Sequence, residues 1–182
     1  MRLTALPRSY YDRGPDEVAP DLLGMLLVRK SAGRLLIGRI VETEAYLPAN
    51  DPAAHSFKGK TARTVSLYKE GGHAYVHRMR QYCLLDIVTG SPDEAGSVLI
   101  RAIEPIEGMK ESIDNLADGP GKVCLALGIT HSLDGIDMTK SSGKLFVVEG
   151  NKGLRDQDRI VSSPRVGISK AKHLELRFRL LG

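Results

Sequence analysis

The sequence predicts an α+β protein with a mostly antiparallel sheet, organised as one domain over residues 1–182. Short apolar runs bounded by turn residues recur along the chain, which is typical of strands joined by tight connections. The helical patterns cluster and do not alternate with the strands, which disfavours a parallel sheet. No internal repeat and no Pro/Gly/Ser-rich linker divides the chain, so we expect a single domain.

In the first half, Pro-Asp-Glu at 15–17 favours a helix start, and that helix should end near residue 24. Strands at 25–29 and 35–45 should meet at the Ala-Gly turn of 32–33, and Asn-Asp-Pro at 50–52 should form a turn before a short helical piece. The further strands are expected at 73–78, 82–88, 97–103, 144–149, 159–162 and 175–180. The further helices are expected at 61–68, 107–115 and 121–127.

The charge balance favours an anionic partner. The net charge is +4 and the sequence pI is about 9.1, which favours association with nucleic acid or a membrane surface. Residues 55–80 carry six Lys or Arg against one acid, and residues 151–182 carry eight against three. After folding, the two segments can form one phosphate-facing surface, although surface Lys and Arg are more often simply solvated.

Cysteine usage and hydropathy narrow the class of protein. Cys83 and Cys124 are far apart and form no CxxC motif, so neither a disulfide framework nor a zinc site is expected. The stretch 1–14 lacks the apolar core of a signal peptide, and no segment approaches a membrane span. We therefore expect a soluble, cytoplasmic protein without a membrane partner.

The stretch from Gly38 to His55, GRIVETEAYLPANDPAAH, carries the strongest functional signal. It begins as a strand and then places Glu42 and Glu44 two residues apart, on one face of an extended chain. Tyr46 follows on the same face. Alternating charges usually mark the solvated face of a strand, whereas this acid-acid-aromatic ending indicates the wall of a pocket that handles a flat group and a water.

This stretch resembles the signature of the alkyladenine DNA glycosylases, the family that removes 3-methyladenine and related damaged purines. Five further blocks are similar to that family in the same order: DLLGMLLVRK, GHAYV, VLIRAIEPIEG, DGPGKVCLALGI and SSPRVGI. The likeness runs from about residue 10 to residue 180. Six collinear blocks make a specific signal, whereas one of them alone would be weak.

The resemblance implies a mixed domain with a curved antiparallel core that acts as a monofunctional hydrolase, without a cofactor or a metal. The implied partner is double-stranded DNA containing damaged purines of the 3-methyladenine, hypoxanthine and ethenoadenine class, bound by a monomer. The damaged base must be flipped out of the duplex before water can reach C1′. The implied product is an intact abasic site.

Site roles carry over residue by residue. Glu44 matches the family's catalytic glutamate, a general base that also stabilises the oxocarbenium-like transition state. Arg101 matches an arginine beside the catalytic water, although an ordinary strand arginine with a buried stem is the alternative. Tyr46 matches a stacking aromatic, and His55 matches a histidine that also hydrogen-bonds the base edge. Glu42 is expected to be structural, paired with a Lys or Arg.

Three positions depart from the family pattern. His77 replaces a second stacking Tyr, and imidazole is smaller and titrates near neutrality, so a protonated His77 would disfavour cationic purines relative to hypoxanthine. Asp86 stands near an Asn that screens out normal guanine, with a plain strand-end residue as the alternative. In this divergent hairpin Arg80 stands where the family has a wedging Tyr. The hairpin is about one residue shorter, so Met79 or Gln81 can be the wedge instead.

The Gly-Pro-Gly-Lys stretch at 119–122 should open a helix and approach DNA phosphate. Glycine permits close backbone contact, a helix start favours an anion, and Lys122 adds positive charge. Without the family context, the same stretch is an ordinary helix start.

Three rival functions stay open. Glu42, Glu44, Asp51 and His55 can in principle ligate a hard cation in a metal-dependent hydrolase. The altered hairpin is also consistent with a non-catalytic nucleic-acid-binding protein on the same fold. A glycosylase that nicks the strand would require an amine nucleophile in the pocket, and no Lys lies within ETEAY or HAYV.

Overall fold

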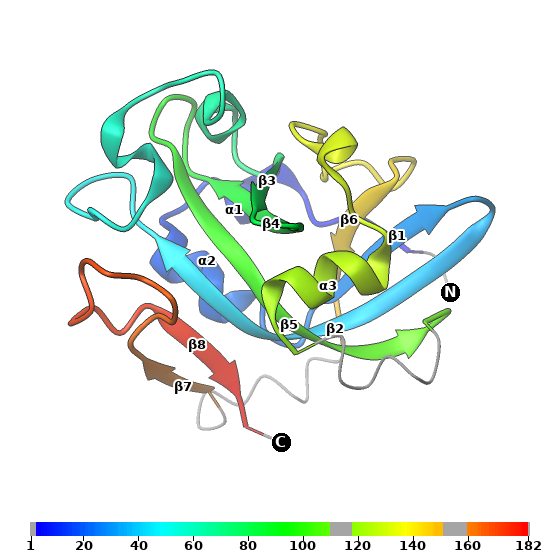
Figure 1. The fold of residues 1–182 in the computed structure, drawn as a ribbon. Coiled ribbons are helices and arrows are strands. Elements are labelled where there is room, and N and C mark those ends of the chain that lie inside the picture. The colour runs from blue at the N-terminus through cyan, green and yellow to red at the C-terminus, as the bar shows by residue number, and fades with distance from the viewer. Residues whose placement is uncertain (1–2, 110–117, 151–159, 182) are drawn as a thin grey trace.

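Two long curved strands, β2 (Arg34–Tyr46) and β5 (Gly96–Glu107), form the centre of the sheet (Figure 1). The computed structural model describes residues 3–109, 118–150 and 160–181. Within them the sheet has eight strands, with the order β3-β4-β5-β2-β1-β6 and a β7–β8 hairpin added beside β2. The remaining strands are β1 (Leu26–Ser31), β3 (Ala74–Met79), β4 (Tyr82–Thr89), β6 (Leu145–Val148), β7 (Ile160–Ser163) and β8 (Arg177–Leu180).

The second half of β2 is enclosed by two partners, which positions the candidate site. β5 runs antiparallel along one edge of β2, whereas β1 occupies the first half of the other edge and β8 the second half. The β8 register sets Glu42 opposite Arg179 and Glu44 opposite Arg177. The C-terminal strand therefore lies directly beside the two carboxylates.

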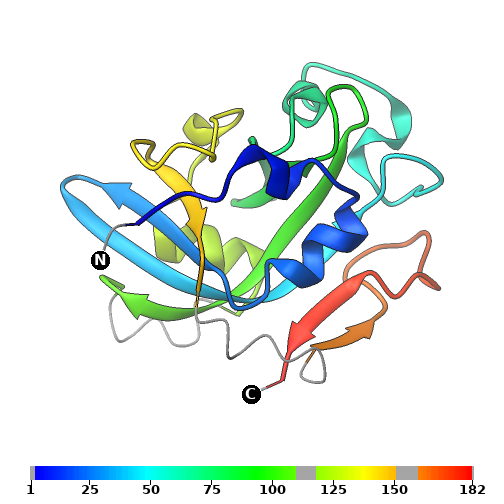
Figure 2. The same ribbon diagram turned by 180° about the vertical axis from the view of Figure 1, so that it is seen from behind.

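Helices cover both sides of the sheet. The α-helices are α1 (Arg8–Tyr11), α2 (Pro15–Asp21) and α3 (Pro120–Leu127), and the 3-10 helices are η1 (His55–Lys58), η2 (Val65–Tyr68) and η4 (His131–Leu133). Seen from the front and from behind, α3 lies against one side of the sheet and α2 against the other (Figures 1 and 2). Both α2 and α3 begin with Pro at the first position, where its missing N–H is not needed. Val18 of α2 and Val123 of α3 are fully buried in the main core.

The α+β class and the curled antiparallel sheet are confirmed, and the expected strands agree with the observed ones to within two residues, except where β5 extends four residues further. The predicted helix at 61–68 is wrong, because only η2 (Val65–Tyr68) forms. Thr61 and Thr64 bond to each other and to nearby backbone groups there, which competes with helix formation. The short helix α1 was not predicted.

The helix expected at 107–115 is wrong at its start, because β5 continues to Glu107. Residues 110–115 of that expected helix lie outside the described residues, as do residues 151–159 of the basic segment 151–182. In the described parts of the chain, no helix is long and apolar enough to cross a membrane.

Candidate active site

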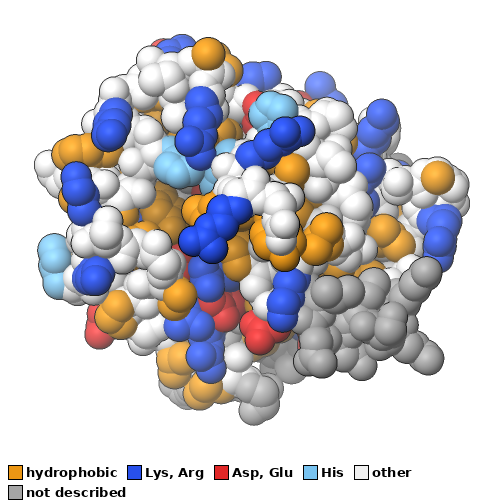
Figure 3. Space-filling view, viewed as in Figure 1, with side chains coloured by type: hydrophobic (Ala, Val, Ile, Leu, Met, Phe, Trp, Pro, Cys, Tyr) orange, Lys and Arg blue, Asp and Glu red, His pale blue; other side chains and the backbone are white. Residues whose placement is uncertain are grey.

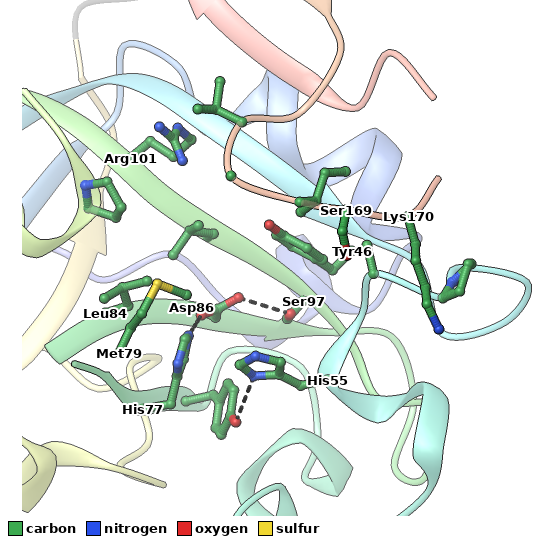
Figure 4. Close-up of a pocket in the computed structure, with 18 of the residues that line it drawn as sticks. Tyr46, His55, His77, Met79, Leu84, Asp86, Ser97, Arg101, Ser169 and Lys170 are labelled. Carbon is green, nitrogen blue, oxygen red and sulfur yellow. Dashed lines mark hydrogen bonds and ion pairs between the residues drawn. The ribbon is translucent and has the colours of Figure 1, made fainter. Parts of the chain in front are cut away.

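A cavity of about 540 Å³ opens beside the end of β2, strands β3, β4 and β5, and the segment 166–170. Six of the sequence-predicted residues line it, and Figure 4 shows them around one open space: Tyr46, His55, His77, Met79, Asp86 and Arg101. Figure 3 shows Lys and Arg side chains around a hollow with hydrophobic and histidine side chains in it. Lys58 and Lys170 also line the cavity. The structure thus gathers most of the predicted base-binding residues in one place.

Glu44 lies immediately behind this cavity and is 0% exposed. Its Oε1 accepts a hydrogen bond from the backbone N–H of Val166 at 2.8 Å, and its Oε2 accepts one from the Tyr46 hydroxyl at 3.0 Å. The Arg101 guanidinium lies 3.4 Å from Oε1. Burial raises the pKa of Glu44, although these three neighbours act in the opposite direction. Tyr46, Arg101 and Val166 all line the cavity. Glu44 is therefore separated from the cavity by a single layer of residues.

Arg101 is directed toward the carboxylates by an irregularity between β2 and β5. The register passes from Ile40–Ile103 to Glu42–Ala102 and then to Thr43–Ile100, so neither Val41 nor Arg101 has a cross-strand partner. Bulges of this kind re-aim side chains near functional sites. The Nε of Arg101 donates to Oε1 of Glu42 at 2.6 Å.

Glu42 also binds a second arginine. The Nε of Arg177, on β8, donates to the same Oε1 at 2.7 Å. Burial alone would raise the pKa of Glu42, but the hydrogen bonds from Arg177 and Arg101 outweigh it and lower that pKa. The expectation that Glu42 pairs with a nearby Lys or Arg is therefore confirmed, with two arginines in place of one.

The opposite wall of the cavity is a cluster of rings. His77 stacks on Tyr75 with centroids 4.9 Å apart and planes at 21°, and His55 meets His77 edge-on at 4.6 Å. His55 also hydrogen-bonds the Tyr75 hydroxyl at 3.1 Å. Desolvation and the neighbouring His77 lower the pKa of His55. One face of His77 is therefore already covered by protein, and only 7% of the residue is exposed.

Asp86 is the immediate partner of His77. Its Oδ2 lies 3.1 Å from Nε2 of His77, and its Oδ1 accepts a hydrogen bond from the Ser97 hydroxyl at 3.1 Å (Figure 4). A protonated His77 would therefore be neutralised by Asp86, and with a neutral His77 the pair would carry a net negative charge. The expected effect of His77 on cationic purines stays a prediction, and the neighbouring carboxylate of Asp86 would act against it.

Tyr46 is held from behind by a buried ion pair that was not foreseen. The Arg165 guanidinium lies over the Tyr46 ring, 4.6 Å from its centroid. It binds Asp51 through two hydrogen bonds of 2.6 and 2.8 Å, and both side chains are 0% exposed. Arg165 also donates to the carbonyl of Ala45 at 2.9 Å. Because Val166 is the next residue, this one pair fixes both the aromatic ring and the donor to Glu44.

Met79 at the hairpin and Pro120 at the start of α3 line the cavity, whereas Arg80, Gln81 and Lys122 do not. Arg80 and Gln81 form the two-residue turn, and Arg80 has a φ of 54°. Tyr82 packs on the first turn of α3, where a Cβ at Gly121 would lie 2.9 Å from the Tyr82 ring. Both tip residues and Lys122 are exposed. Their predicted contacts with DNA stay predictions.

Among the described residues, no three His, Cys, Asp or Glu side chains are grouped so that they could hold a metal ion.

The phosphate-facing surface expected from the two basic segments is smaller than the sequence suggests. Arg165 is buried and Arg177 pairs with Glu42, so neither is free to meet phosphate.

Several contributors to the site were missed at the level of sequence. Val166 and Arg165 lie in the SSPRVGI block, which signalled their segment but not their roles. Tyr75 lies in GHAYV. Lys170 was counted only as part of the basic segment 151–182, and Ser97 carried no signal, because their positions at the cavity depend on strand pairing and on the path of the segment 164–176.

Comparison with known proteins identifies the family. Residues 9–182 match the family model described as methylpurine-DNA glycosylase. The chain is 44% identical to the "Putative 3-methyladenine DNA glycosylase" of Methanocella arvoryzae, covering 96% of this chain and 90% of that protein. Proteins of the same name from Carboxydothermus hydrogenoformans and Koribacter versatilis are 42% and 39% identical, covering 96% and 100% of this chain and 94% and 92% of theirs. The chain belongs to the methylpurine-DNA glycosylase family and is therefore a DNA glycosylase.

Proposed function

We propose that this protein removes alkylated purines from double-stranded DNA and hydrolyses the N-glycosidic bond of a base flipped into the cavity. The observation that carries the proposal is the position of Glu44. It is a buried carboxylate that contacts three residues of the cavity wall, Tyr46, Arg101 and Val166. A binding site for a base thus adjoins a group able to activate water.

The chemistry requires a base for the water and a negative charge near the sugar. A carboxylate has about four lone-pair sites, so Glu44 can accept from a water in addition to its two protein donors. Burial raises its pKa, which makes the ionised form a stronger proton acceptor. The same charge stabilises an oxocarbenium-like transition state in a site from which bulk water is excluded.

The flipped base is proposed to stack on Tyr46. Arg165 covers one face of that ring, which leaves the other face for a ligand in the cavity that Tyr46 lines. His55 and His77 form the wall of rings and would contact the base edge or its second face.

Cationic alkylated purines are the proposed preferred substrates. The His77–Asp86 pair supplies no net positive charge to the cavity, and Asp86 is a carboxylate within its lining. A carboxylate near the base favours a purine with a formal positive charge over a neutral one such as hypoxanthine.

Met79 is proposed to fill the gap left in the DNA stack. It is 50% exposed, apolar, and adjoins the cavity that receives the base. Gln81 instead donates to the Tyr82 hydroxyl at 2.9 Å, and Arg80 forms the turn itself. Apolar wedges between base steps are common in proteins that distort DNA, so Arg80 and Lys122 are assigned to phosphate.

Base release tests the proposal. Single-turnover reactions in EDTA would compare methylated duplex DNA with duplexes carrying hypoxanthine or 1,N6-ethenoadenine. The expected products are free 3-methyladenine and abasic sites that break only with alkali. Nicking without alkali, together with a borohydride-trapped complex, would show that Lys58 or Lys170 acts as an amine nucleophile and would contradict the monofunctional reaction.

A further inference from the structure

Four charged side chains on three neighbouring strands form a connected cluster behind the cavity. Glu42 and Glu44 lie on β2, Arg101 on β5 and Arg177 on β8. All are largely buried, with exposed side-chain fractions of 10%, 0%, 14% and 19% in that order. The two arginines balance the two glutamates in charge. Both arginines donate a hydrogen bond to Glu42, whereas Glu44 has only the longer ion pair with Arg101.

Arg101 is hydrogen-bonded to Glu42 and only ion-paired with Glu44. Its Nε donates to Glu42 at 2.6 Å, whereas its terminal nitrogen stops 3.4 Å from Glu44. The first is a short charge-assisted hydrogen bond, and the second is an ion pair at the limit of hydrogen-bonding distance. The Arg101 guanidinium thus lies near Glu44, the carboxylate that would activate water, but its hydrogen bond is to Glu42.

We propose that Glu42 is a positioning residue, which holds Arg101 and Arg177 away from Glu44 and so keeps Glu44 free to accept a proton from water. The inference deepens the proposed function and rests on the role of Glu44 as general base. Glu42 contacts neither the cavity nor the reacting atoms in this assignment.

The groups around Glu44 show which charges Glu42 offsets. The groups that face Glu44 are Tyr46 on its own strand, Arg101 on β5, Arg177 opposite it on β8, and the N–H of Val166 in the C-terminal segment, with Glu42 nearby. Of these, Glu42 alone carries a negative charge and acts to raise the pKa of Glu44. Without it, Arg101 can close the 3.4 Å gap, and a second cation, Arg177, loses its hydrogen bond to Glu42.

Closure of that gap would weaken the base. Two guanidiniums facing a single carboxylate favour its ionised form and lower its affinity for a proton. The ion pair would also occupy the lone pairs that a water needs. Loss of Glu42 should therefore slow the chemical step while leaving DNA binding intact, since the cavity wall is unchanged.

Four variants test this inference: Glu42→Gln, Glu42→Asp, Arg177→Gln and the control Glu104→Gln. The control removes a carboxylate whose ion pair with Arg39 also joins β2 to β5, but on the exposed surface. The assay is the single-turnover rate of 3-methyladenine release from methylated duplex as a function of pH. Affinity is measured on a duplex carrying a tetrahydrofuran abasic-site analogue, which cannot be cleaved.

Glu42→Gln should lower the rate at neutral pH by at least roughly tenfold, a fraction of the 10²–10⁴-fold that general acid–base catalysis supplies. The acid limb of the pH profile should move to lower pH, because the activity requires ionised Glu44. Arg177→Gln removes a cation and should move that limb to higher pH. Glu42→Asp should restore part of the rate, and Glu104→Gln should match the unmodified protein.

An unchanged rate and pH profile for Glu42→Gln would overturn the inference, and so would a shift of both variants in the same direction. If Glu42→Gln fails to fold, the other two variants test the inference. It then stands only if Arg177→Gln moves the acid limb of the pH profile to higher pH and Glu42→Asp retains part of the rate. An inactive unmodified protein would refute the proposed function and this inference together. An active one with an indifferent Glu42→Gln would refute only the role of Glu42.

Discussion

Replacing Asp51 by Asn should be among the most destabilising single-atom changes in this protein. Each carboxylate oxygen of Asp51 accepts two hydrogen bonds: Oδ1 from Arg165 and the N–H of Ala53, and Oδ2 from Arg165 and the N–H of Leu47. Whichever way an Asn amide is turned, its NH₂ faces two donors. Arg165 would also remain as a buried charge without a counter-ion.

The magnitude follows from these contacts. Two buried donors without acceptors cost about 1–3 kcal/mol each, which agrees with the roughly 3–5 kcal/mol measured when one partner of a buried ion pair is removed. With a urea m-value of about 2 kcal/mol/M, the midpoint of unfolding should fall by roughly 1.5–2.5 M. Equilibrium urea unfolding at pH 7, followed by circular dichroism, measures this shift.

The matched control is Asp93→Asn. Asp93 pairs with Lys60 at 3.4 Å, but the two side chains are 76% and 53% exposed. Its backbone φ of 71° is one that Asn adopts readily. This variant should stay within about 0.5 kcal/mol of the unmodified protein. A loss below about 1 kcal/mol for Asp51→Asn would refute the reasoning that the buried pair holds this part of the fold together.

The pH dependence of the same variant has a definite sign. Burial alone would raise the pKa of Asp51, but the hydrogen bonds from Arg165 and from two backbone N–H groups lower it below the ordinary 3.8. A lowered pKa in the folded state contributes stability that is complete above the unfolded value and is lost as the pH falls through the folded one. The gap between the unmodified protein and Asp51→Asn should therefore narrow only below about pH 4.

Four further outcomes are expected. In a background that cannot cleave, Tyr46→Ala should weaken binding of a damaged duplex by about 1–3 kcal/mol, the value of one base–aromatic stack, while Tyr46→Phe should bind normally; equal affinity for the Ala variant would remove Tyr46 from the pocket. Asp86→Asn should lower the ratio of 3-methyladenine to hypoxanthine release by roughly ten- to thirtyfold, for a unit charge about 8–12 Å away at an effective dielectric constant near 20. A constant ratio would contradict the charge argument. Arg80→Ala should lower the log–log salt slope of duplex binding by about 1, whereas Met79→Ala should leave that slope unchanged and reduce base flipping; the reverse result would exchange their roles. Glu44→Gln should unfold at higher urea concentration at pH 7. The raised pKa of Glu44 means that folding favours its uncharged form, so the stability contributed by the protonated side chain is lost as the pH rises. A lower stability of Glu44→Gln would show that the hydrogen bonds of Glu44 outweigh the cost of its burial.

The sheet was largely predictable because its strands are local patterns. Alternating apolar residues and two tight turns identify the β1–β2 and β3–β4 hairpins without any tertiary information. The end of β5 was not predictable from such patterns. Pro105 of β5 pairs with Gly38, near the start of β2. The sequence around Glu107 resembles a helix start, and the long-range pairing with β2 makes it a strand instead.

The site was predictable only as far as the resemblance reached. The sequence nominated Glu44, Tyr46 and the rings around them, and the structure brings these residues together at one cavity. The sequence did not show which arginine pairs with which carboxylate. Arg165 and Asp51 are 114 positions apart, and Arg177 and Glu42 are 135 apart. Such pairs depend on the placement of β8 and of the segment before it, for which no local pattern exists.

The comparison of unmodified protein with Glu44→Gln tests the central claim most directly. Single-turnover release of 3-methyladenine from methylated duplex and binding to the tetrahydrofuran duplex would be measured side by side for both proteins. The account predicts that the unmodified protein cleaves, and that Glu44→Gln binds with similar affinity but leaves no alkali-labile sites. A near-normal rate for Glu44→Gln would show that another group activates the water. Binding without cleavage by the unmodified protein would mean that the fold serves only to bind DNA.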